Sequence, residues 1–135
     1  MTKPTITINE LDAERLDALL AQPAFAGTVV AQALNEELDR AEILPPNAIP
    51  ADVVTMNSEV KISFLNNNNT VKFKIVYPEE ANIRENKISI FSPIATALLG
   101  YRTGMEVEWM VPAGLTKIHI DEILYQPEAA GNYNL

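Results

Sequence analysis

The stretch KISIFSPIATALLG, residues 87–100, combines a strand pattern with the start and the end of a helix. Apolar and polar residues alternate over 87–91, which is typical of a strand that buries one face. Ser92 followed by Pro93 is the expected start of a helix, because serine caps helices and proline suits the first helical position. Gly100 is the expected stop. The stretch therefore predicts a strand that leads directly into one short helix.

Four further segments on either side of this stretch show the same period of two. Apolar residues alternate with polar ones over 60–64, 71–75, 107–111 and 118–120. The asparagine run 66–69 predicts a turn, since asparagine tolerates positive φ. After Ile120 the next inward pair is Ile123 and Tyr125, an odd step that indicates a bulge around 121–122. Residues 53–135 therefore predict a twisted antiparallel sheet crossed by one helix, an α+β domain.

Residues 1–44 predict a short antiparallel helical hairpin, coiled-coil-like in its packing. Leucines recur at helical spacing over 11–20 and 34–38, and Asn9 or Asp12 could cap the first helix. Helices of ~14 residues reach only about 20 Å. The predicted tip consists of Pro23, Ala24, Phe25, Ala26 and Gly27. Residues 45–52 contain three prolines and predict a linker.

The composition excludes several classes of protein. The chain has 135 residues and no cysteine, which excludes disulfides, thiolate nucleophiles and cysteine-based zinc sites. Ten Lys+Arg against 18 Asp+Glu give a net charge of −8, so we expect no direct sequence-specific binding of nucleic acid. No segment is apolar enough to span a membrane, and we expect a cytoplasmic protein. The excess of acidic residues in 1–44 favours binding to a basic protein partner, or it simply keeps the protein soluble.

No residue pattern indicates catalysis, a metal site or a cofactor. Nucleotide-binding and metalloprotease motifs are absent from the sequence. His119, the single histidine, lies within a predicted strand and is expected to be structural. Adjacent acids such as Glu79 and Glu80 diverge in a helix or strand, so they do not form acid/base pairs. The aromatic residues Phe64, Phe73, Phe91, Trp109 and Tyr125 are expected in the core, although a ligand pocket walled by them stays open as an alternative.

The C-terminal part resembles the C-terminal domain of bacterial Gre transcript-cleavage factors. The resemblance rests on residues 87–100 with the following Gly104, and on 54–60. It implies an FKBP-like fold for this domain. It also implies that the segment Ser92, Pro93, Ile94 and Ala95 contacts RNA polymerase.

Both ends of the chain resemble the Rnk-like branch of the same family, through residues 11–16, 33–41 and 125–131. The resemblance implies a protein that binds RNA polymerase at its secondary channel and competes with Gre factors. Gre factors carry two carboxylates at the tip of a long coiled coil, which complete a Mg²⁺ site in the polymerase. The tip 23–27 has no carboxylate, so we expect no stimulation of cleavage. The acids Glu36, Glu37 and Asp39 are candidates for contacts at the channel rim.

Two alternatives assign the C-terminal domain a different role. An FKBP-like fold can carry peptidyl-prolyl isomerase activity, although a fold does not by itself imply a function. A small-ligand sensor that binds a nucleotide is the other, and the lack of a basic cluster in the sequence counts against it.

We expect a monomer, because each apolar helix stripe can be covered within the hairpin.

Overall fold

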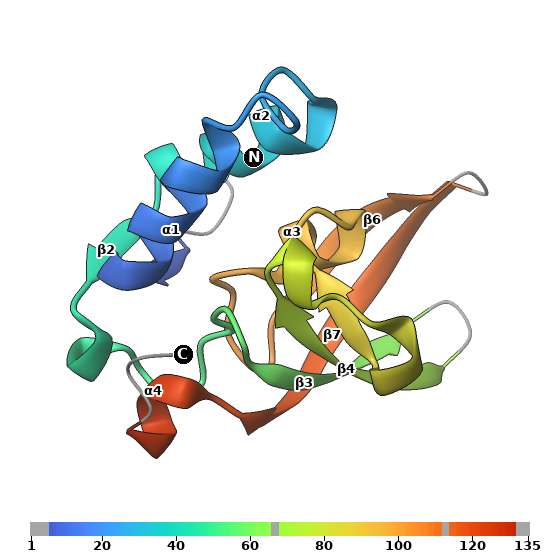
Figure 1. Ribbon diagram of the computed structural model, residues 1–135. Helices are drawn as coiled ribbons and strands as arrows, with labels where there is room; N and C mark the ends of the chain where they lie inside the picture. Colours follow the sequence, from blue (N-terminus) through green and yellow to red (C-terminus); the bar gives the residue numbers. More distant parts are fainter. Residues whose placement is uncertain (1–5, 66–67, 112–113, 132–135) are drawn as a thin grey trace.

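The computed structural model describes residues 6–65, 68–111 and 114–131, which form a helical hairpin and a twisted sheet (Figure 1). Within this part of the chain the fold is α+β and the larger sheet is mostly antiparallel. The helices are α1 (Glu10–Leu20), α2 (Val29–Asp39), α3 (Pro93–Leu98) and α4 (Pro127–Ala130). The strands are β1 (Thr7–Asn9), β2 (Glu42–Leu44), β3 (Glu59–Phe64), β4 (Asn69–Val76), β5 (Lys87–Ser89), β6 (Glu106–Val111) and β7 (Gly114–Tyr125).

The predicted helical hairpin is present as α1 and α2. Asn9 caps α1: its Oδ1 accepts hydrogen bonds from the backbone N–H groups of Leu11 at 2.7 Å and Asp12 at 3.1 Å. Thr28 caps α2, and its Oγ1 accepts from Ala31 N–H at 3.1 Å. Each helix has 11 residues and is therefore only about 16 Å long.

A parallel pair of short strands closes the base of the hairpin, which the sequence analysis did not predict. β1 lies beside β2, with Thr7 opposite Glu42 and Asn9 opposite Leu44. Each strand has three residues, which is too short for an alternation of apolar and polar residues to stand out. The pair holds both ends of the hairpin together beside the sheet domain.

The larger sheet has the strand order β5-β4-β3-β7-β6. The prediction of a wholly antiparallel sheet is wrong at one edge, where β5 runs parallel to β4 with Ile88 opposite Ile75. Alternation along a strand reports which face is buried but not the direction of its neighbour. The predicted bulge is confirmed: Ile62 lies opposite Ile120 and Lys61 opposite Glu122, so Asp121 has no counterpart in β3.

The predicted short helix is α3, shifted by one residue toward the N-terminus. Gly100, which follows it, has a φ of +85° and lies directly beneath β1. Thr7 N–H donates to Gly100 O at 3.2 Å, and Gly100 N–H donates to Val54 O at 2.8 Å. A Cβ at this position would lie 2.7 Å from the Cβ of Ile6, so only glycine fits the crossing.

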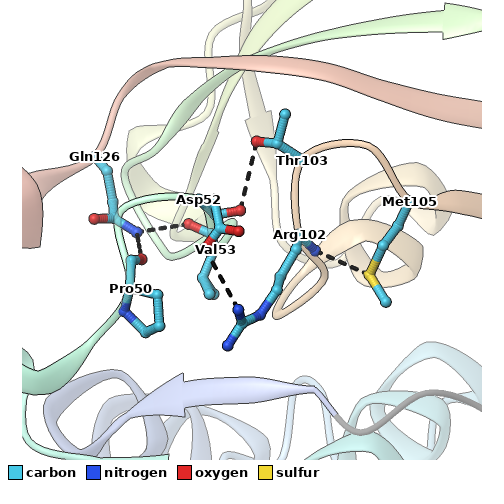
Figure 2. Close-up of polar contacts among 7 residues, drawn as sticks. All are labelled: Pro50, Asp52, Val53, Arg102, Thr103, Met105 and Gln126. Carbon is cyan, nitrogen blue, oxygen red and sulfur yellow. Dashed lines mark hydrogen bonds and ion pairs between the residues drawn. The ribbon is translucent and has the colours of Figure 1, made fainter.

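The C-terminal end of the predicted linker is fixed to the sheet domain (Figure 2). Gln126 Nε2 donates to the carbonyl oxygens of Pro50 at 2.8 Å and Val53 at 2.7 Å. Thr103 N–H donates to Asp52 O at 2.9 Å, and the Arg102 guanidinium lies 3.8 Å from the Asp52 carboxylate. These contacts fix where the chain enters the sheet domain.

The hairpin and the sheet domain share one hydrophobic core. Leu16 of α1 and Leu34 of α2 are fully buried in the same cluster as Ile62, Leu98 and Ile120. Figure 1 shows the hairpin on the α3 side of the sheet. Of the aromatic residues predicted for the core, Phe73 is buried, Phe64, Phe91 and Tyr125 are half-buried, and the side chain of Trp109 lies outside the described set.

Candidate functional site

The segment predicted to dock is the turn between β5 and α3. Ser92 occupies the N-cap position of α3, but its hydroxyl makes no capping hydrogen bond, contrary to expectation. Its Oγ is shielded from solvent and has no partner among the described atoms. The turn is instead held by Thr96 Oγ1, which donates to Ile90 O at 2.7 Å. A polar group that is buried without a partner marks this turn as unusual.

The four residues of this segment differ in what they can offer to a partner. Ile94 is half-buried, whereas Ala95 is fully buried in the core. Ala95 therefore has no side chain to offer a partner, whereas Ile94 and the part of Ser92 other than its Oγ are partly accessible. Pro93 is the first residue of α3, and its side chain lies outside the described set.

The hairpin tip lies against the residue that precedes this segment. Phe25 of the tip stacks on Phe91, with ring centroids 4.5 Å apart and an interplanar angle of 18°. Such aromatic stacking stabilises by about 0.5–1.5 kcal/mol beyond the apolar area that it buries. The other tip residues, Pro23, Ala24, Ala26 and Gly27, are exposed. Phe25 and Phe91 are 66 residues apart in sequence. Their contact joins the tip and the candidate docking turn into one continuous surface.

The candidate rim acids lie at the C-terminal half of α2. Glu36 and Asp39 are exposed, whereas Glu37 is half-buried and forms an ion pair with Arg40. Glu36 and Asp39 are therefore the two that could meet a basic partner directly.

A buried polar network joins the hairpin to the sheet domain. Glu128 of α4 is 7% exposed, and its carboxylate accepts hydrogen bonds from Asn9 Nδ2 at 2.5 Å and from Thr55 Oγ1 at 2.8 Å. Ser58 Oγ lies 2.8 Å from Thr55 Oγ1 and accepts from Thr55 N–H. Asn9 therefore caps α1 with one end of its amide and binds α4 with the other.

Asp12 is a second buried carboxyl group in this network. It is 3% exposed, and it accepts hydrogen bonds from Met56 N–H and Tyr77 Oη–H, both at 3.3 Å. Burial, together with the nearby Glu128 carboxylate, raises the pKa of Asp12 from 3.8 to about 7. Burial also raises the pKa of Tyr77. The Asp12 carboxyl group thus titrates near neutral pH at the junction of the two parts.

This junction was not predicted, although the sequence contains one signal for it. Asp12, Leu16 and Leu20 follow one another at intervals of four, and all three are buried on the same face of α1. An acid on an apolar helix face predicts a buried carboxyl group. No comparable signal exists for Glu128, which lies in a four-residue helix.

His119 is part of a structural contact at the β7 bulge. Its Nδ1 lies 2.5 Å from an Asp121 oxygen, and the Ser63 hydroxyl donates to the other oxygen of that carboxylate. Desolvation raises the pKa of Asp121, but the hydrogen bonds from Ser63 and His119 outweigh it, and the net shift is downward. The carboxylate separates the serine from the imidazole, so the three groups do not form a nucleophile–base pair. Among the described residues, no three His, Asp or Glu side chains are grouped to hold a metal ion.

Two family models match the chain and together cover most of it. Residues 49–125 match the C-terminal domain of the transcription elongation factors GreA/GreB, and residues 4–44 match the Rnk N-terminus. The chain belongs to the GreA/GreB family. The boundary between the two matches falls in the segment that leads from β2 into the sheet domain.

Individual relatives agree with this family. The chain is 48% identical to a "Regulator of nucleoside diphosphate kinase" of Escherichia coli (strain K12), and the alignment covers 100% of both chains. It is 34% identical to "Transcription elongation factor GreA" of Syntrophotalea carbinolica over 68% of this chain and 58% of that protein. A solved structure of a "Prokaryotic transcription elongation factor GreA/GreB from Nitrosomonas europaea" has 40% identity and a TM-score of 0.75, covering 91% of this chain and 100% of that one.

The family is one of transcription elongation factors. The comparisons give no support to the isomerase or the ligand sensor considered above. Across the described ranges, no helix is long and apolar enough to cross a membrane.

Proposed function

We propose that this chain is a non-enzymatic transcription regulator that binds RNA polymerase at its secondary channel and competes there with Gre factors without stimulating transcript cleavage. Ser92 and Ile94 make the contact at the C-terminal domain. The exposed acids Glu36 and Asp39 face the basic rim of the channel.

The absence of carboxylates from the hairpin tip carries this proposal. A Mg²⁺ ion that activates water needs anionic oxygen ligands about 2.1 Å away. Residues 23–27 supply none, and each hairpin helix has only 11 residues. The tip is also held back on the sheet domain by the stacking of Phe25 on Phe91. A short hairpin in this position covers an entrance without reaching a distant metal ion.

Displacement of a labelled Gre factor from core RNA polymerase tests the proposal. The wild-type chain is expected to displace the label in a concentration-dependent way. The double variant Ser92→Ala/Ile94→Ala is expected to need a roughly tenfold higher concentration, which corresponds to about 1.4 kcal/mol of binding free energy. Asn35→Ala, on an exposed position of α2, is the control and should displace the label like the wild type. No displacement at micromolar concentration would contradict the proposal.

A further inference from the structure

β4 is longer than the strand beside it, which leaves part of its outer edge open. β5 pairs with β4 only along Lys74–Val76, whereas β3 covers the other side of β4 along Asn69–Lys74. Within the described chain, residues 69–73 therefore have a neighbouring strand on one side alone. An open strand edge is a template for the addition of another strand.

Two residues present their backbone groups at this open edge. Lys74 N–H donates to Asn86 O at 2.8 Å on the β5 side, and Ile75 N–H donates to Ser58 O at 3.1 Å on the β3 side. Backbone groups alternate sides along an antiparallel strand. The N–H and C=O groups of Lys72 and Thr70 therefore point to the open side.

An apolar groove of about 590 Å³ lies beside the open edge. Its lining includes Val71, Phe73, Ile83, Ile88, Ile94 and Ser92. Ile83 is 87% exposed and Val71 is 39% exposed, although both are large apolar side chains. Apolar side chains of an added strand can be covered here.

The opposite face of the same edge carries lysines, which the sequence alone did not reveal as a cluster. Lys72 lies directly across from Lys61, and Lys74 directly across from Lys87. Like charges in directly opposite positions repel. Lys87 Nζ lies 3.4 Å from a carboxylate oxygen of Glu85. Glu122 lies opposite Lys61 and Glu59 opposite Lys74. Among the described residues, however, Lys72 has only Lys61 directly opposite, so the position beside Lys72 favours an acidic side chain.

We propose that the open edge of β4 binds an extended segment of another polypeptide with an apolar–acidic–apolar pattern. The segment pairs with the backbone of Thr70 and Lys72. Its apolar side chains lie opposite Val71 and Phe73 and enter the groove. Its acidic side chain lies opposite Lys72, because side chains in directly opposite positions share a face of the sheet. This inference does not depend on binding to RNA polymerase.

The surface favours a polypeptide over other occupants. Nucleic acid offers no apolar side chains for the groove, and Glu59 and Glu85 beside the lysines repel a continuous phosphate backbone. A second copy could pair its β4 with this β4 about a two-fold axis, but such pairing would bring the lysines of the two edges together, and like charges repel.

A peptide-binding titration followed by fluorescence anisotropy tests the proposal. The probe is a blocked, labelled peptide of alternating valine and glutamate, about six residues long, since residues 69–73 extend over about 16 Å. We expect saturable binding to the full chain and no binding of a matching valine–lysine peptide. Lys72→Glu reverses the charge and is expected to weaken binding at least ~10-fold. Lys117→Glu replaces an exposed lysine of β7 and should leave the affinity for the peptide unchanged.

Thr70→Pro separates strand addition from simple charge attraction. Proline removes an N–H group that faces the open side, so the β3–β4 ladder stays intact while strand addition is lost. Hydrogen exchange should also show protection of the Thr70 and Lys72 amides by the peptide. Equal binding by Thr70→Pro or Lys72→Glu, or protection elsewhere, would overturn the proposal. So would lysine-dependent binding of a single-stranded RNA oligonucleotide, or self-association of the chain that Thr70→Pro abolishes.

Discussion

Phe25 and Phe91 stack on each other with their ring centroids 4.5 Å apart, and this contact fixes the tip of the hairpin to the sheet domain. Phe91 precedes Ser92, so the orientation of the hairpin is coupled to the turn proposed to meet RNA polymerase. Both rings are half-buried, which is unusual for the tip of a short hairpin whose other residues are exposed.

Phe25→Ala is expected to lower the free energy of unfolding by about 1–2 kcal/mol, because the variant loses both the stacking and part of the buried apolar area. Urea denaturation measures the loss, and hydrogen exchange should show increased opening around residues 21–28. Val29→Ala serves as the control, since Val29 is 81% exposed beside the same tip and should change stability by less than about 0.5 kcal/mol. Equal effects of the two variants would show that the stacking does not hold the tip.

Asn9 has two separable roles that substitutions can distinguish. Asn9→Ser keeps a capping oxygen for α1 but loses the donor to Glu128, which leaves that buried carboxylate with one partner fewer. We expect a loss of about 1–3 kcal/mol in the free energy of unfolding. Asn9→Asp keeps the cap but places two carboxylates together, so its loss should be larger at neutral pH and smaller near pH ~5. Urea titrations at both pH values make the comparison, and a loss of the same size at both would contradict the geometry.

The stability of the protein should depend on pH through Asp12. The folded state holds this proton up to a pKa of about 7, whereas the unfolded chain releases it near 3.8. The folded state therefore binds more protons in that window, and the free energy of unfolding falls as pH rises from 3.8 to about 7, by about 2–4 kcal/mol. Asp12→Asn should remove most of this slope.

Asp17→Asn is the matched control for that titration, because Asp17 lies on the same helix and is exposed. It should keep the slope of the wild type. A wild-type free energy of unfolding that is constant between pH ~4 and pH ~7 would contradict a raised pKa for Asp12.

Gly100→Ala tests the crossing of β1 over the sheet domain. The new Cβ would lie 2.7 Å from Ile6 Cβ, at a φ of +85° that alanine rarely adopts. We expect a loss of about 2–4 kcal/mol, from backbone strain together with overpacking. Gly104→Ala has the same backbone strain, at φ +89°, but nothing lies within 4 Å of its Cβ. Thermal or urea unfolding should therefore show a clearly smaller loss for Gly104→Ala, and equal losses would mean that the close approach to Ile6 does not matter.

The sequence predicted the elements whose pattern is local. The cap at Asn9, the bulge at Asp121 and the end of α3 at Gly100 each follow from a few adjacent residues. What it did not predict depends on contacts between distant segments. The pairing of Thr7 with Glu42 joins one three-residue strand that precedes the hairpin to another that follows it. The parallel direction of β5 depends on the path of residues 77–86.

For the candidate site, too, the sequence singled out only local features. Ser92 and Pro93 stood out because a serine–proline pair before an apolar run has a known local geometry. The Phe25 contact did not, since a single aromatic residue in a turn gives no indication of its partner. The burial of Glu128 was also invisible, because acids are almost always exposed unless they are paired, and its partner Asn9 is 119 residues away.

Transcript cleavage in backtracked RNA polymerase complexes tests the central claim most directly. Purified chain should leave the rate of RNA hydrolysis at the level of the polymerase alone, and it should suppress the stimulation by an added Gre factor as its concentration rises. Ser92→Ala/Ile94→Ala should suppress that stimulation less effectively. Faster hydrolysis with the chain alone, from a preparation free of Gre factors, would contradict the account.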